Sequence, residues 1–178
     1  MRSVRIGFST PKDRLLIFPW LIRKRDNTKY SHSYWRFKSE SWGTDFIYQN
    51  SGMHTNFMGS KRFEQINEVI EEIEIKVSDE IESKIGKLCV NREGKGYAVG
   101  QVLWKGVLWV ISIITFGKIE LKNPIPDNDY ATDCIEESAK ILSLGLGIDV
   151  KIDMDSATVK QWYDFVKQLE AKNALRAN

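Results

Sequence analysis

The sequence predicts an α+β fold, in which a central antiparallel sheet packs against helices within a single domain spanning residues 1–178. Runs of alternating apolar and polar residues, rich in aromatic and β-branched side chains, dominate the chain up to residue 77, and helical patterns with capping signals dominate the remainder. The length of 178 residues is enough for one well-packed core. The composition, 42% hydrophobic and 28% charged, is that of an ordinary globular protein.

The chain begins with a short strand and an interrupted helix. Val4–Phe8 has the alternation of a strand. Pro11 then ends this strand and opens a helix that runs to about Arg25, with an interruption at Pro19.

A β-hairpin follows. Its two strands are Ser31–Phe37 and Thr44–Asn50, joined by a polar loop. A register in which paired residue numbers sum to 81 puts Arg36 opposite Asp45 and His32 opposite Gln49. A slip of one residue loses the charge pair, so we expect this register.

The middle of the chain contains two more strands and two helices. In order, these are a strand over Thr55–Gly59, a strand over Ile70–Val77, a helix over Ser78–Cys89 and a helix over Tyr97–Phe116. Ser78 precedes an acidic first turn, which is the pattern of an N-cap. The helix over 97–116 is apolar on nearly every face, so we expect it to be buried. Its most hydrophobic stretch is well short of the roughly 20 residues needed to span a bilayer.

The last third of the chain contains a loop and two helices. Asn123–Asp129 holds two prolines and is typical of a turn-rich loop. A helix begins after Asp133 and ends near Gly145 or Gly147. An amphipathic helix begins at Ser156.

Cys134 stands where a helix most favours a thiolate. Asp133 and Glu136 have the spacing of an N-cap acid and its partner three residues later, so Cys134 falls at the first helical position. Free N–H groups and the positive end of the helix dipole lower the pKa of a thiol there. The two flanking carboxylates oppose this effect, so the thiol needs a histidine partner near neutral pH.

His32 is the better candidate for this base, because it lies in a predicted strand with a polar neighbour across the hairpin. A cysteine–histidine pair needs a third group that holds the ring in the correct tautomer, and a neutral amide can do this. The predicted register gives this role to Gln49. Asn50 and His54 are the alternatives if the register differs by one residue or the strand bulges.

The composition disfavours other chemistry. Cys89 and Cys134 lack the short ligand spacing of a zinc site, so we expect no metal and no cofactor, and we expect Cys89 to be a structural residue. The net charge of +2 argues against nucleic acid as the main partner. An interface for nucleic acid on the basic first forty residues is the weakest alternative. The first residues lack an export signal, so we expect a cytoplasmic location.

The order of these features resembles the circularly permuted NlpC-type branch of the papain-like cysteine peptidases, in which the histidine precedes the cysteine. Four segments carry the resemblance: LIRKRDNTKYSHSYW, FIYQNSGMHTNF, GKGYAVGQ and DYATDCIEESAKIL. Members of that branch carry a Ser-His pair at a strand start, a polar residue on the next strand, a Gly-x-x-Tyr segment and a Cys-Ser-Glu-like motif that opens a helix. The resemblance implies that His32 is the base, Gln49 its orienting residue, Cys134 the nucleophile and Tyr97 a support for the oxyanion.

The resemblance implies a cysteine hydrolase, of peptidase, amidase or acyltransferase type, that acts on an amide or acyl-ester carbonyl. The small chain, rich in lysine and isoleucine, suits a phage-encoded protein, which would associate with the virus particle. The sequence departs from the family pattern at Gln49, where glutamate is common, and at Ala98, where aspartate is usual. These departures leave open an inert papain-like module that binds protein partners in a larger assembly.

Overall fold

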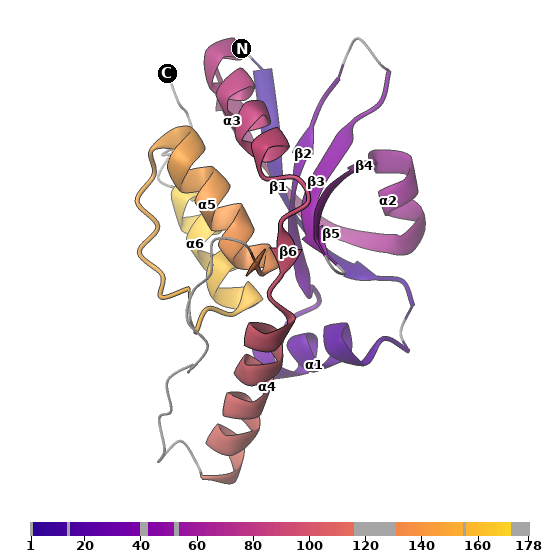
Figure 1. The fold of residues 1–178 in the computed structure, drawn as a ribbon, viewed down its shortest axis with the longest axis vertical. Coiled ribbons are helices and arrows are strands. Elements are labelled where there is room, and N and C mark those ends of the chain that lie inside the picture. The colour runs from indigo at the N-terminus through magenta and orange to yellow at the C-terminus, as the bar shows by residue number, and fades with distance from the viewer. Residues whose placement is uncertain are drawn as a thin grey trace.

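The structure is a computed structural model that describes residues 2–13, 15–39, 43–51, 54–115, 131–154 and 156–171. In these ranges it is an α+β fold built on a seven-stranded sheet with the strand order β5-β1-β2-β3-β4-β6-β7 (Figure 1). The strands are β1 (Arg2–Pro11), β2 (His32–Phe37), β3 (Phe46–Ser51), β4 (His54–Gly59), β5 (Asn67–Val77), β6 (Gly96–Tyr97) and β7 (Ala131–Thr132). β6 and β7 pair in parallel, so the sheet is mixed. The prediction of an antiparallel sheet therefore holds for the other strand pairs and is wrong for this one.

Six helices lie in the described part of the chain. They are α1 (Ile17–Asp26), α2 (Ser60–Ile66), α3 (Asp79–Asn91), α4 (Val99–Ile114), α5 (Cys134–Leu146) and α6 (Val159–Ala171). Figure 1 shows α3, α5 and α6 on one side of the sheet, α2 on the other side, and α1 with α4 at one end of the molecule.

The main hydrophobic core lies between the sheet and the helices α3, α5 and α6. Alternate residues of β1, from Val4 to Phe8, are fully buried in this core together with side chains from all three helices. A smaller cluster on the opposite face packs beneath α2 and consists of Tyr34, Ile47 and Phe63. Both faces of the central strands are therefore covered.

Most of the predicted elements are confirmed. The strands expected over 4–8, 55–59 and 70–77 are all present, with ends that differ by a few residues. Ser78 caps α3 as predicted, because its side chain accepts a hydrogen bond from the Ile81 N–H at 3.3 Å. The helix that begins after Asp133 ends at Gly147, which has the left-handed conformation (φ 68°) that glycine adopts easily. The predicted loop over Asn123–Asp129 lies outside the described residues.

The predicted hairpin register was wrong by two residues. Gln49 lies opposite Tyr34 and not opposite His32. A shift of two residues leaves every side chain on the same face of the sheet. Arg36 consequently stays near Asp45, its predicted partner, with 3.6 Å between Nη1 and Oδ2. The pattern of charges therefore fits both registers.

The start of α1 differs from the prediction because β1 is longer than expected. β1 continues to Pro11, which pairs with Asn67 of β5. The helix then begins at Ile17, so Pro19 lies in its first turn and not in its interior. The missing N–H of a proline removes no helical hydrogen bond at that position.

The start of α6 is set by a local capping box and by a residue from α1. α6 begins at Val159 and not at Ser156. The Thr158 hydroxyl accepts a hydrogen bond from the Gln161 N–H at 3.1 Å, and the Gln161 side-chain oxygen accepts one from the Thr158 N–H at 2.8 Å. The buried carboxylate of Asp26 also accepts a hydrogen bond from the Val159 N–H at 2.9 Å, and this contact, between residues 133 positions apart, is the part that the local pattern could not reveal.

The expectation that the helix over 97–116 is buried was wrong. α4 extends from the body of the molecule (Figure 1), and six of its large hydrophobic residues are exposed. Its apolar composition suits a buried helix and an exposed apolar helix equally well, because hydrophobic periodicity does not report what covers a surface.

Candidate active site

The N-terminus of α5 is formed by a buried aspartate cap. Asp133 Oδ1 accepts hydrogen bonds from the N–H groups of Ile135 at 2.9 Å and Glu136 at 2.8 Å. Cys134 is therefore the first helical residue, as predicted. The Glu136 carboxylate contacts Lys140, one turn further along, at 2.7 Å.

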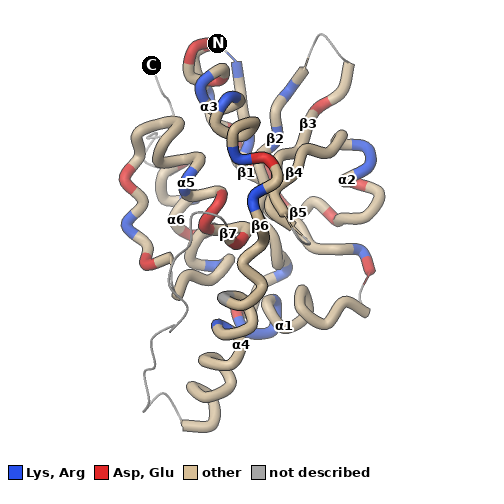
Figure 2. The backbone as a smooth tube through the Cα atoms, in the orientation of Figure 1, with Lys and Arg blue, Asp and Glu red and all other residues tan. Residues whose placement is uncertain are grey.

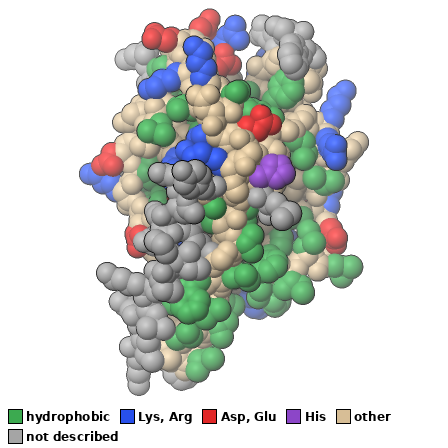
Figure 3. Space-filling view, in the orientation of Figure 1, with side chains coloured by type: hydrophobic (Ala, Val, Ile, Leu, Met, Phe, Trp, Pro, Cys, Tyr) green, Lys and Arg blue, Asp and Glu red, His purple; other side chains and the backbone are tan. Residues whose placement is uncertain are grey.

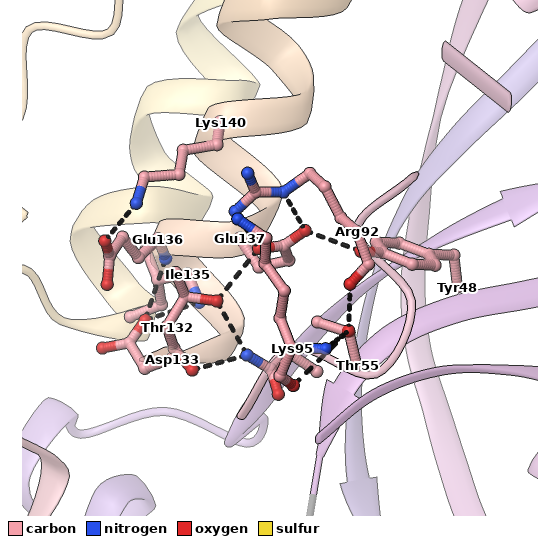
Figure 4. Close-up of polar contacts among 11 residues, drawn as sticks. Tyr48, Thr55, Arg92, Lys95, Thr132, Asp133, Ile135, Glu136, Glu137 and Lys140 are labelled. Atoms are coloured by element: carbon pink, nitrogen blue, oxygen red, sulfur yellow. Dashed lines mark hydrogen bonds and ion pairs between the residues drawn. The ribbon is translucent and has the colours of Figure 1, made fainter. Parts of the chain in front are cut away.

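A buried polar network holds this helix against the sheet (Figure 4). The Glu137 carboxylate accepts hydrogen bonds from the Tyr48 hydroxyl at 2.6 Å, from Arg92 at 2.7 and 2.6 Å, and from the Thr132 hydroxyl at 2.9 Å. Burial raises the pKa of Glu137, but the hydrogen bonds from Arg92 and Tyr48 outweigh burial, and its pKa lies below the ordinary value. The carboxylate is therefore charged and fully engaged, and its role is to position α5.

Asn50 belongs to the same anchoring region. Its side-chain amide donates hydrogen bonds to the Thr132 carbonyl at 2.5 Å and to the Thr132 hydroxyl at 2.9 Å. This contact joins β3 to β7, directly before Cys134. Asn50 therefore positions the start of α5 and does not orient His32. His54, the other alternative orienting residue, is exposed on β4.

His32 and Gln49 are in contact, as the sequence predicted. His32 Nε2 lies 3.0 Å from Gln49 Oε1. The contact runs diagonally between β2 and β3, because the two-residue register shift keeps both side chains on one face. With Nε2 held by the amide oxygen, Nδ1 is the ring nitrogen that remains for a second partner.

The Cys134 thiol lies beside the start of β2. A hydrogen bond from the Ser33 backbone reaches the thiol, and Ser33 directly follows His32. The Ser33 side chain contacts the same helix, with 3.1 Å between its hydroxyl and that of Ser138. Among the described residues, no hydrogen bond joins the Cys134 thiol to the His32 ring. The fold thus brings the thiol to the backbone next to the histidine. The His32 ring itself lies with Gln49 and Tyr34 on the α2 face of the sheet, and Ser33 faces α5 on the opposite side.

Tyr97 lies near the same thiol. It is the residue of β6 that pairs with Thr132 of β7, two positions before Cys134. Burial raises the pKa of Tyr97, and the charges of Cys134 and Asp133 raise it further. Its hydroxyl therefore stays protonated and able to donate a hydrogen bond.

Both members of the proposed pair are neutral near pH 7. Burial, followed by the charge of Asp133, raises the pKa of Cys134 to about 12, and the hydrogen bond from Ser33 opposes this only in part. Burial lowers the pKa of His32 to about 4 against the opposing effect of its hydrogen bond to Gln49. The protein alone therefore holds a thiol and a neutral imidazole, and not a preformed ion pair.

Cys134 forms part of the wall of an apolar pocket of about 340 Å³. The pocket lies between α1, α4 and the start of α5, and its lining includes Phe18, Leu21, Val102, Gly106 and Tyr97. This volume is in the range of small-molecule sites. His32 and Gln49 are not part of its described lining.

Lys105 is the residue of this site that sequence reasoning missed. Its ammonium contacts Asp133 Oδ2 at 2.7 Å and the Met154 carbonyl at 2.9 Å, and both charged side chains are almost fully buried. The pair fixes α4 to the cap of α5 and balances the charge of Asp133 beside the thiol. The sequence did contain a signal for this role, because Lys105 is the one ionisable residue in the apolar helix α4.

In the described ranges, no group of three or more His, Cys, Asp or Glu side chains is arranged to hold a metal ion. No helix in that part of the chain is both long and apolar enough to cross a membrane. No protein-family model matches this chain, and no curated protein matches it.

Glu137→Gln is expected to lower the free energy of unfolding by about 3–5 kcal/mol at neutral pH, because it removes the carboxylate charge from a largely buried ion pair with Arg92. Urea denaturation measures this change. The pKa of Glu137 is lowered on folding. The contribution of this carboxylate to folding stability is therefore complete at pH values above its ordinary pKa of 4.5, and it is lost as the pH falls through the folded-state pKa. The variant should therefore show a weaker acid dependence. Glu74→Gln, at an exposed position of β5, is the matched control and should change stability by less than about 0.5 kcal/mol.

Alkylation of Cys134 by iodoacetamide is expected to accelerate about tenfold per pH unit between about pH 7 and 9, since the thiolate fraction grows in that proportion below the pKa. Cys89 should react more slowly, because burial raises its pKa further and its side chain is fully covered. Peptide mass spectrometry of the timed reactions, with Cys89→Ser as control, measures both rates. A plateau of the Cys134 rate near pH 7 would contradict the raised pKa.

Proposed function

We propose that this chain is a cysteine hydrolase or acyltransferase that uses Cys134 as its nucleophile and His32 as its base. The observation that carries the proposal is the position of the Cys134 thiol, at the first residue of α5, in the wall of a pocket and hydrogen-bonded to the backbone that follows His32. The hydrogen bond between His32 and Gln49 supports the role of Gln49 as the orienting residue.

The proposed fold is the permuted papain-like arrangement. Three features support it: the histidine strand β2 precedes the cysteine helix α5 in the chain, α5 packs on the sheet beside β2, and the orienting amide comes from the neighbouring strand β3. Fold alone does not establish an activity, so the chemistry needs its own test.

The proposed reaction begins with proton transfer, since thiol and imidazole are both neutral in the protein alone. Sγ of Cys134 attacks the substrate carbonyl carbon while its proton passes to His32 Nδ1, a step that requires the His32 ring to turn from the α2 face of the sheet toward the thiol. The tetrahedral intermediate then expels an alcohol or amine, which takes the proton from the imidazolium. Water attacks the resulting thioester through the same base and releases a carboxylic acid and the thiol. In an acyltransferase, a second alcohol or amine takes the place of water.

The oxyanion of the intermediate needs hydrogen-bond donors that are in place before the reaction. The backbone N–H of Cys134, at the helix N-terminus, is one proposed donor. The Tyr97 hydroxyl is the other, because it stays protonated and lies near the thiol.

The proposed acyl group is hydrophobic. The pocket beside Cys134 is lined mainly by aliphatic and aromatic side chains. Its charged lining residues are paired, Lys105 with Asp133 and Arg25 with Asp26. A hydrocarbon chain gains about 0.8 kcal/mol for each methylene group buried in such a site. A polar peptide would lose its hydration there without replacement partners.

An inert module that binds an apolar ligand is the second candidate. Two observations favour it: the raised pKa of Cys134, and the position of the His32 ring on the face of the sheet opposite α5. This candidate predicts ligand retention in the pocket without a covalent intermediate.

Turnover of p-nitrophenyl esters of increasing acyl length distinguishes the two candidates. The hydrolase is expected to release p-nitrophenol and to form a Cys134 thioester, seen as the added acyl mass in the intact protein. Cys134→Ser and His32→Gln should each lower kcat/KM by about a hundredfold or more. Cys89→Ser should leave it unchanged. Equal turnover by wild type and Cys134→Ser, with no acyl adduct, would exclude the hydrolase.

Gly106→Phe is expected to change chain-length selectivity. Gly106 lines the pocket, and a Cβ at this position meets nothing within 4 Å, so the new ring can occupy pocket space without a backbone clash. The kcat/KM for a dodecanoyl ester should fall about tenfold or more relative to a butyryl ester, the equivalent of two or more buried methylene groups. Gly59→Phe makes the same change outside the pocket lining and is the control. Unaltered selectivity in Gly106→Phe would place the acyl group elsewhere.

A further inference from the structure

Exposed hydrophobic side chains are concentrated at one end of the molecule. Among the described residues, eleven of the fourteen large hydrophobic side chains that are exposed lie in two segments, five in 15–20 and six in 99–114. They are Leu15, Leu16, Ile17, Phe18 and Trp20 at the start of α1, and Val99, Leu103, Val107, Val110, Ile113 and Ile114 on α4. Figure 3 shows hydrophobic side chains gathered at the end where Figure 1 places these two helices. Soluble proteins rarely leave so many large apolar side chains together without a partner surface. We call this set the apolar tip.

The charged residues of α1 and α4 near the apolar tip are mostly basic. The last turn of α1 carries Arg23, Lys24 and Arg25, and α1 appears basic in Figure 2. Asp26, the acid of α1, is turned inward, where it caps α6. α4 carries no acidic residue. Asp13, two positions before Leu15, is an exposed acid near the tip in the described part of the chain.

This combination fits the surface of an anionic lipid bilayer better than it fits a protein. Trp20 and Phe18 are aromatic residues of the kind that anchor proteins at the membrane interface. A basic helix end beside them suits negatively charged headgroups, to which each lysine or arginine near the surface adds attraction. α4 is too short to cross the bilayer, so contact would be with one leaflet.

We propose that the apolar tip docks this protein on an anionic lipid surface. The helices α1 and α4 enter the headgroup region, and Lys24 faces the lipid phosphates. The pocket beside Cys134 lies between the same two helices, so docking brings that pocket to the lipid surface. The docking itself does not depend on thiol chemistry and goes beyond the proposed function.

Cosedimentation of the purified full chain with vesicles tests this proposal. We expect binding to vesicles of phosphatidylcholine mixed with phosphatidylglycerol, weaker binding at high salt, and little binding to phosphatidylcholine alone. The double substitution of Ile113→Asp and Ile114→Asp should lower the partition coefficient about tenfold or more. Lys24→Glu should lower it several-fold, and only with the anionic vesicles. Cys134→Ser should bind as wild type does, which separates docking from catalysis.

Leu144→Asp is the matched control, because Leu144 is 52% exposed on α5 and lies outside the apolar tip, while Ile113 is 55% exposed. This variant should bind vesicles as wild type does. Three results would overturn the proposal: wild type that stays in the supernatant with every vesicle, a loss in Leu144→Asp equal to that of the double variant, or a dimer in solution that the double variant converts to a monomer. The last result would assign the apolar tip to a second copy of the chain.

Discussion

Glu137 joins three elements that are distant from one another in the sequence. Its carboxylate accepts hydrogen bonds from Tyr48 of β3, from Arg92 at the end of α3 and from Thr132 of β7. Glu137 itself lies in the first turn of α5. A buried ion pair of this kind contributes little net stability compared with apolar packing, but its directional hydrogen bonds admit one arrangement of its partners. The position of Cys134, three residues earlier, follows from that arrangement. The candidate site is thus located by a polar constraint, while the hydrophobic core beneath it supplies the stability.

Local signals in the sequence were sufficient where a feature depends on neighbouring residues. The aspartate cap put Cys134 at the first helical position, and the cap is formed by contacts within three residues. The His32–Gln49 contact also followed from the sequence, although the predicted register was wrong, because a shift of two residues conserves the face on which each side chain lies. The predicted contact between His32 and Gln49 was thus right, and the predicted strand pairing was wrong.

Features that depend on distant contacts could not be predicted. The contact of Asp26 with the start of α6 joins residues 133 positions apart, and the path of α4 depends on Lys105 and Asp133, which are 28 residues apart. An apolar pattern indicates that a helix avoids water and does not indicate whether protein, ligand or lipid provides the cover. The pocket and the apolar tip are both surfaces of α4 that the rest of the described residues leave open, and the sequence of α4 alone did not distinguish them from a buried face.

The raised pKa of Cys134 and the apolar pocket have the same physical cause, which is the exclusion of water from the N-terminus of α5. Burial that disfavours the thiolate in the protein alone also strengthens hydrogen bonds to an oxyanion that forms there, because the surroundings do not screen them. For the proposed hydrolase, a thiol that ionises only as it attacks is protected from soluble electrophiles. An acyl chain that fills the pocket would supply the binding energy that such a site requires. Burial of the thiol therefore favours a hydrophobic acyl substrate over a freely soluble one.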